Sequence, residues 1–441
     1  MTVSDCTKIV LSTPENGAQV TSTPCSDPDY WWYTIGQNLK SALSAAGYPE
    51  DVRESVLGHF RETVCPNMGS RMYSRGPKST ICPDGSPFHC SFELKESTDD
   101  ILVRCSLDLR TGHWTAKLGE QCQDATQLLV AQLAPRMLHS DSRWFDSLSK
   151  SLGNTHLSEE DRQNLFSASA SRATTVVGFD VKRTMGDTLH LPVNMKVAHF
   201  AAHTAIKDGI SQWDALRASI KGLPDIEIYP NFLRGFKLLE DYIESKHKAF
   251  KDGALALSTD ILVPSQARLK LYLFPPSDNF DNLWDYYTLG GQIPGLETDR
   301  KKFEELMMLF YGTTSPEIVG QGHEIPRLCH KRTLMYFSLC ARRPYPDPKI
   351  YFYVPNSIFC DDVYIKGLDR WLETNGWNVG HQTLEDRVKA CLLTSKSKHR
   401  PLSQNAGIFL CIGLGRKGND VDGDLSMQVY LTPELGEPPV Y

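Results

Sequence analysis

The chain has 441 residues, of which 41% are hydrophobic and 10% aromatic, so it can bury a large core as one big domain or as two to three ordinary ones. Its net charge of -6 gives no support to a general nucleic-acid footprint, which needs a basic face. No run of about 18 apolar residues is present, so no membrane span is expected.

The N-terminal sequence lacks the charged and then apolar layout of a secretory signal. The 12 cysteines are scattered and include no Cys-x-x-Cys pair, so neither a zinc site nor a disulfide framework is indicated. These features predict a cytoplasmic protein with reduced thiols.

Residues 1–28 are rich in Thr, Ser, Pro and Asn, and we expect a flexible N-terminal arm followed by a single domain over residues 29–441. Hydrophobic periodicity then predicts five successive units, each with two helices followed by two strands. The predicted helices are 31–46, 51–64, 123–133, 158–169, 213–220, 231–247, 279–289, 299–310, 361–374 and 384–393. The predicted strands are 88–94, 101–109, 176–182, 189–201, 254–262, 267–274, 333–339, 350–354, 408–414 and 425–431.

Successive hairpins pair with their neighbours in an antiparallel sense, and closing the sheet into a barrel removes its edges. The ten helices can cover the apolar outer faces of the strands. The prediction is therefore an α+β fold in which ten antiparallel strands surround a solvent-shielded lumen inside an outer ring of helices. A TIM barrel is excluded because it needs one helix after each parallel strand.

The predicted strand at 267–274 shows what the lumen would contain. One face carries Ala267, Leu269, Leu271 and Leu273, and the other carries Arg268, Lys270 and Tyr272. Any one strand of this type could be a solvated edge strand with a snorkelling lysine. The same mixture of cations and rings recurs elsewhere, which favours a common interior. The recurring sets are Lys349, Tyr351 and Tyr353, and Lys196, Ala198 and Phe200.

Inward-facing cations need a bound anion, because an unpaired buried charge is costly. A diphosphate matches the five candidates Arg104, Lys196, Arg268, Lys270 and Lys349. No Asp-Asp-x-x-Asp cluster for magnesium is found, so neither a metal nor another cofactor is expected. The rings beside the cations could stabilise a carbocation by about 0.5 to 2 kcal/mol each. These rings are Tyr272, Tyr351, Tyr430 and Phe200.

Four motifs carry a resemblance to a known family: Gly85-Ser86-Pro87-Phe88, Arg268-x-Lys270-x-Tyr272, Trp284 with Thr288-Leu289-Gly290-Gly291, and Pro348-Lys349-Ile350-Tyr351-Phe352. From about Trp31 to Tyr430 the chain resembles the fungal aromatic prenyltransferases of the dimethylallyltryptophan synthase type. The resemblance implies the ααββ prenyltransferase barrel and a prenyl diphosphate held by the five cations. It also implies that Tyr272, Tyr351 and Tyr430 shield the carbocation and that no metal is required.

The departures from the family pattern bear on the acceptor. His89 stands where indole-using members carry a glutamate, and it shares the predicted lumenal face with Glu93. A histidine can orient or deprotonate a phenol. Leu255 replaces an arginine that binds the amino-acid carboxylate, and Ala198 replaces a cage tyrosine. Lys182 matches a lysine that takes up the proton of the arenium ion. A role for Arg416 as a further diphosphate ligand is left open.

The sequence therefore favours an enzyme of fungal secondary metabolism that moves a dimethylallyl group from dimethylallyl diphosphate to a non-indole phenolic or polyketide-derived ring. Catalysis would use His89 and Lys182, and Ala198, Leu255 and Glu93 would contact the acceptor. A geranyl donor, and a monomer or a homodimer, stay open. The alternatives are an indole or tryptophan-derived acceptor and a non-catalytic isoprenoid-binding barrel. A phosphatase-like hydrolase ranks last, because no nucleophile is placed.

Overall fold

The computed structural model describes residues 26–69, 81–109, 122–154, 174–186, 189–277, 279–311, 333–354, 359–377, 382–394, 401–417 and 423–434, with a few isolated positions between them. Ten antiparallel strands close into a barrel in the order β1-β10-β9-β8-β7-β6-β5-β4-β3-β2. The strands are β1 (Phe88–Lys95), β2 (Thr98–Leu107), β3 (Thr175–Val181), β4 (Val193–Phe200), β5 (Ala254–Asp260), β6 (Arg268–Leu273), β7 (Leu334–Cys340), β8 (Arg343–Tyr353), β9 (Phe409–Lys417) and β10 (Asp424–Leu431).

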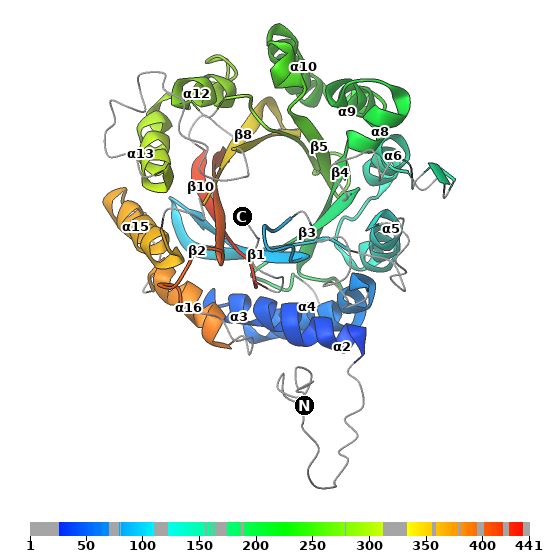
Figure 1. Cartoon of the computed structure of the whole chain (residues 1–441). Helices are drawn as coiled ribbons and strands as arrows, with labels where there is room; N and C mark the ends of the chain where they lie inside the picture. The colour runs from blue at the N-terminus through cyan, green and yellow to red at the C-terminus, as the bar shows by residue number, and fades with distance from the viewer. Residues whose placement is uncertain are drawn as a thin grey trace, which may run out of the picture.

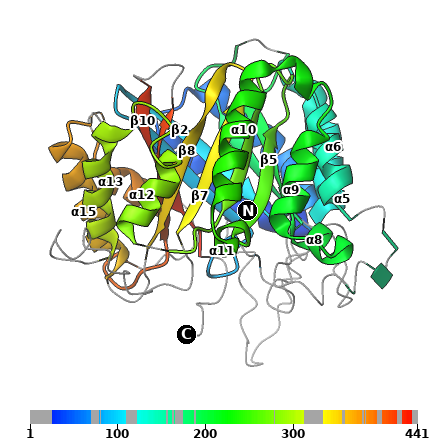
Figure 2. The same ribbon diagram turned by 90° about the horizontal axis from the view of Figure 1, so that it is seen from above.

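The helices form a ring outside the barrel, as the view along its axis shows (Figure 1), and they flank the strands in the perpendicular view (Figure 2). The α-helices are α2 (Asp27–Trp31), α3 (Gln37–Ala45), α4 (Glu50–His59), α5 (Cys122–Leu133), α6 (Arg143–Leu152), α8 (Ala202–Asp208), α9 (Gln212–Lys221), α10 (Pro230–Ser245), α11 (Lys248–Lys251), α12 (Phe280–Thr288), α13 (Arg300–Tyr311), α15 (Asp361–Thr374) and α16 (Leu384–Thr394). Two π-helical turns, Trp32–Gly36 and Phe60–Val64, continue α2 and α4.

Alternation along each strand separates the core from the lumen. On β6, Leu269, Leu271 and Leu273 point outward and are almost fully buried under the helices. Their neighbours Arg268, Lys270 and Tyr272 point inward. The hydrophobic core therefore lies between barrel and helices, and the lumen is free to carry polar side chains.

The predicted fold is confirmed: the barrel has the ten antiparallel strands in hairpin order. Two details differ. The helix Arg143–Leu152 was not predicted, although its apolar stripe of Trp144, Phe145, Leu148 and Leu152 is buried. Most of the predicted helix at 158–169 lies outside the described residues, as does most of the expected N-terminal arm.

The two ends of the barrel differ in their connections. The connections within the five strand pairs, from β1–β2 to β9–β10, lie at one end, and the segments that lead to and from the helices meet the other end. Within the described part of the chain, no helix is both long enough and apolar enough to cross a bilayer.

Candidate active site

The lumen contains a cavity of about 460 Å³ that is lined by residues from all ten strands. Its volume is within the usual range for small-molecule sites. The lining residues are Ile81, His89, Arg104, Ser106, Val176, Lys196, Ala198, Phe200, Leu255, Ala256, Lys270, Tyr272, Phe274, Leu334, Tyr336, Tyr351, Tyr353, Leu410, Cys411, Gln428 and Tyr430.

A layer of charged residues occupies the part of the lumen nearest the hairpins. Arg268 at the start of β6 is held by Asp260 at the end of β5, with Nε to Oδ2 at 2.7 Å and Nη2 to Oδ1 at 3.0 Å. The backbone N–H of Arg268 also donates to Asp260 Oδ2 at 3.1 Å. On the opposite side, Arg104 pairs with Glu93 across β1 and β2. Both guanidinium groups are thus oriented by carboxylates.

Asp180 on β3 connects three of the cations. Its carboxylate pairs with Lys196 on β4, lies 3.5 Å from Arg104 Nε on β2, and lies 3.4 Å from Arg268 Nη2 on β6. Burial alone would raise the pKa of the Asp180 carboxyl, but Arg104, then Lys196 and Arg268, hold it well below its usual value. The carboxylate therefore stays ionised.

Lys270 and Lys349 occupy a different environment. No carboxylate of the described residues forms an ion pair with Lys270, whose Nζ lies 5.7 Å from the ring centroid of Tyr336. Burial, then the charges of Arg268 and Lys196, lowers the pKa of Lys270 well below its usual value. Lys349 Nζ donates to Gln428 Oε1 at 3.0 Å and lies 5.9 Å from the Tyr351 ring centroid.

The sequence alone implied five inward cations that would need an anion, but the lumen also contains Glu93, Asp180 and Asp260. These carboxylates offset part of the positive charge, and an excess of two remains among the eight groups when all five cations are protonated. The site is thus still suited to an anion, with less excess charge than the cations alone would give.

A continuous arc of rings lies next to the cations. Tyr272, Tyr336, Tyr351 and Tyr430 follow one another around the lumen with centroid separations of 5.3, 5.9 and 5.7 Å. His89 extends the arc at 5.3 Å from Tyr430. Burial raises the pKa of all four phenols above its usual value. The arc therefore offers neutral π-faces, which attract a cation.

The wall across from this arc is apolar. Val176, Ala198, Phe200 and Ala256 line it, together with Leu255, which joins Ala256 at an irregularity in the pairing of β5 with β6. The charged residues among those lining the cavity are Arg104, Lys196 and Lys270. The wall consequently suits an uncharged ring system.

Five of the residues singled out from the sequence are not among the cavity-lining residues: Arg268 and Lys349, which lie in the charged layer, and Lys182, Glu93 and Arg416. Lys182 follows the last residue of β3 and is not among the lining residues. Glu93 is buried against Arg104. Arg416 is held outside the lumen by Asp299, with Nε to Oδ2 at 2.7 Å, so it does not join the cations.

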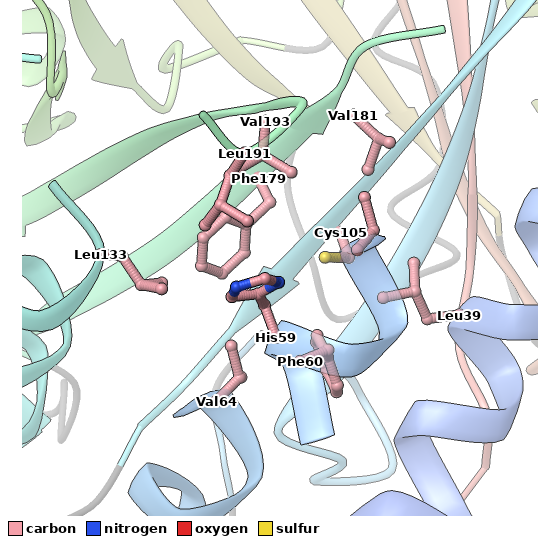
Figure 3. Close-up of a pocket in the computed structure, with 11 residues that line it drawn as sticks. Leu39, His59, Phe60, Val64, Cys105, Leu133, Phe179, Val181, Leu191 and Val193 are labelled. Carbon is pink, nitrogen blue, oxygen red and sulfur yellow. The ribbon is translucent and has the colours of Figure 1, made fainter. Parts of the chain in front are cut away.

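A second, much smaller cavity lies between the helices and the outer face of β2, β3 and β4. Its volume is about 30 Å³, and His59 projects into it among Leu133, Phe179 and other apolar side chains (Figure 3). This volume holds about one water molecule, which would need two to four polar partners. The lumen, where the cations and the rings lie side by side, is the candidate site.

Sequence reasoning missed Tyr336, Asp180 and Gln428. Tyr336 faces Lys349 and Tyr272 across its two neighbouring strands. Alternation in the predicted strand at 333–339 would have placed it on one face with Leu334 and Ser338, but that strand lacks the lysine or arginine that marked the others. The pairing of Asp180 with Arg268 joins residues 88 positions apart and depends on barrel closure.

Residues 27–387 match the family described as tryptophan dimethylallyltransferase. The chain is 38% identical over 431 residues to the DMATS-type prenyltransferase mfmD of Annulohypoxylon moriforme, covering 96% of this chain and 95% of the relative. It is 36% identical to the prenyltransferase phnF of Penicillium herquei, covering 93% of each. The chain belongs to the tryptophan dimethylallyltransferase family. It is an aromatic prenyltransferase of the fungal DMATS type.

The fold of this aromatic prenyltransferase is shared with solved structures. AnaPT from Neosartorya fischeri superposes with a TM-score of 0.75 over 95% of this chain and 97% of its own, at 17% identity. The likeness confirms the prenyltransferase barrel.

Proposed function

We propose that the enzyme ionises dimethylallyl diphosphate in the lumen and transfers the dimethylallyl group to a phenolic or polyketide-derived aromatic acceptor. The observation that carries the proposal is that a layer of cations and an arc of aromatic rings lie next to each other in one cavity. Arg104, Lys196 and Lys270 line it beside Tyr272, Tyr336, Tyr351 and Tyr430. The cations neutralise the departing diphosphate, and the neutral rings stabilise the allyl cation.

In this proposal Arg268 and Lys349 complete the diphosphate site, and Arg and Lys supply the positive charge without a divalent metal. Arg268 offers a guanidinium fixed by Asp260, and Lys349 is fixed by Gln428. Groups that are oriented before the donor binds lose little entropy during the reaction.

The acceptor proposal depends on His89 at the end of the ring arc and on the wall opposite the arc. His89 lies beside Tyr430 and opposite Ser106 in the register of β1 with β2, so a phenol bound near it could donate a hydrogen bond to the imidazole. Leu255 and Ala198 offer no charged partner for the carboxylate of an amino acid. The ring attacks the allyl cation, and His89 accepts the proton that restores aromaticity.

The test is incubation with dimethylallyl diphosphate and a panel of indoles, phenols and hydroxynaphthalenes, with EDTA present. We expect diphosphate release and a phenolic product heavier by one C5H8 unit. Transfer to indoles alone would overturn the acceptor assignment, and activity that needs added magnesium would overturn the metal-independent one.

A further inference from the structure

Asp180 differs from the other carboxylates of the charged layer in the number of cations that it contacts. Among the ion pairs of the described residues, Glu93 pairs with Arg104 and Asp260 with Arg268, whereas Asp180 pairs with Arg104, Lys196 and Arg268. These cations come from β2, β4 and β6, and Asp180 lies on β3. Asp180 is thus the carboxylate that pairs with cations from three different strands.

Those three cations are among the groups assigned above to the diphosphate. With Asp180 in place, each already contacts a carboxylate oxygen. An incoming diphosphate must share them with Asp180 or displace it. Because a charge inside the lumen interacts strongly with its neighbours, the competition between the two anions has a large effect on affinity.

We propose that Asp180 is a resident counter-anion that competes with diphosphate for Arg104, Lys196 and Arg268 and thereby speeds the departure of inorganic diphosphate after prenyl transfer. This role rests on the proposed diphosphate site. A cluster of cations that assists cleavage of the carbon–oxygen bond also retains the product, which has lost its prenyl group and is at least as negative as the donor. Asp180 weakens that retention because its carboxylate re-forms ion pairs with the same cations as the diphosphate leaves.

The alternative role for Asp180 is to position the cations. The two roles predict opposite changes in the affinity for diphosphate when Asp180 is removed. A positioning carboxylate, once removed, leaves the cations poorly aligned, and diphosphate binds more weakly. A competing carboxylate, once removed, leaves a more positive site, and diphosphate binds more tightly.

The experiment measures the Kd of inorganic diphosphate by calorimetry for the wild type, Asp180→Asn and Asp180→Glu. The matched control is Asp299→Asn, which removes a buried carboxylate from Arg416 outside the lumen. We expect Asp180→Asn to lower the Kd roughly tenfold, Asp180→Glu to restore it, and the control to leave it unchanged. In single-turnover assays Asp180→Asn should keep a fast chemical step while its steady-state kcat falls.

If Asp180→Asn proves unstable, Lys196→Met and Lys196→Met with Asp180→Asn give the same comparison, because the double variant keeps the wild-type charge excess. The double variant should then bind diphosphate more tightly than Lys196→Met. An unchanged or higher Kd on loss of Asp180 overturns the counter-anion role. If the wild type neither binds nor cleaves dimethylallyl diphosphate, the proposed function fails instead.

Discussion

The tyrosines of the ring arc carry hydroxyl groups that phenylalanines would lack, and burial determines how these groups behave. Each phenol is held in the neutral form by burial, so it presents a π-face while its oxygen stays a weak nucleophile. A phenolate at the same place would attack the allyl cation and alkylate the enzyme. The hydroxyls of Tyr430 and Tyr351 also contact each other, at 3.5 Å.

Tyr336 lies in the middle of this arc, so its removal should destabilise the carbocation. We expect Tyr336→Ala to lower kcat by about threefold to thirtyfold, the equivalent of one cation–π contact, and Tyr336→Phe to retain most activity. Measuring kcat at saturating donor, together with the dimethylallyl alcohol formed by water attack, checks this. Tyr345→Ala, an exposed tyrosine on β8, is the control and should behave as wild type.

His89 should act on the acceptor and not on the donor. His89→Ala is expected to lower kcat/KM for the acceptor by about 100-fold, which is typical of losing a positioned acid–base group. His89→Gln, which keeps a hydrogen-bond acceptor, should recover part of that loss. Donor affinity should stay the same in both variants, as measured with inorganic diphosphate. A parallel loss of diphosphate binding would contradict the assignment.

The residues of the site could be predicted where one strand carries both cations and rings at alternate positions. Arg268, Lys270 and Tyr272 stand at alternate positions, and all three face inward. Tyr336 was missed because its own strand carries no lumenal cation. The engagement of Glu93 by Arg104 was missed because it requires the register of β1 against β2.

At the scale of the element, glycines on two strands make room for the lysines of the site. A Cβ on Gly413 of β9 would lie 2.7 Å from Lys349 Cε and 2.9 Å from Tyr351 Cε1. A Cβ on Gly178 of β3 would lie 2.6 Å from Lys196 Cε. Each lysine side chain thus lies over a glycine of the neighbouring strand. The space left by the glycine, which has no side chain, determines where the lysine ammonium group lies.

Gly413→Ala should therefore displace both Lys349 and Tyr351 while leaving the barrel intact. We expect kcat/KM for the donor to fall, by up to about 100-fold if the shift approaches 1 Å. The melting temperature should change little, because alanine is tolerated in a strand. Gly58→Ala in α4, where an added Cβ meets nothing within 4 Å, is the control and should raise stability by about 0.5 to 1 kcal/mol without affecting turnover.

Most elements were predictable because each has one buried face. Leu269, Leu271 and Leu273 mark a strand, and the hairpin order follows from consecutive strand pairs. The helix Arg143–Leu152 was not predicted, even though its buried aromatic and leucine residues recur at helical spacing. The glycine spacing of β9, with Gly413 and Gly415 on one face, was visible in the sequence, but its purpose required the neighbouring strand.

At the scale of the whole molecule, the charges of several strands are coupled through the lumen. Lys270 comes from β6, and its pKa is lowered first by burial and then by Arg268 and Lys196. Between that lowered pKa and the ordinary lysine value of about 10.4, the unfolded chain binds a proton that the folded protein does not. Over this window the free energy of unfolding therefore rises with pH.

Binding of a diphosphate should reverse this shift, because an adjacent anion raises the pKa of Lys270. We expect proton uptake on binding, and a Kd that increases as the pH rises above the pKa of Lys270 in the free enzyme. Calorimetry in two buffers with different ionisation enthalpies measures the uptake. Lys270→Met should abolish most of it, and equal uptake in that variant would assign the proton to another group.

Because the barrel is closed, the residues that stabilise the fold and the residues that line the cavity point to opposite faces of each strand. Outward side chains such as Leu271 pack under the helices, and inward ones such as Ala198 and Leu255 line the cavity. Since the two sets alternate, an inward residue can change without loss of the contacts that keep the chain folded. A lineage with this architecture can acquire new aromatic partners through single substitutions, each tolerated at once by a scaffold that is stabilised elsewhere.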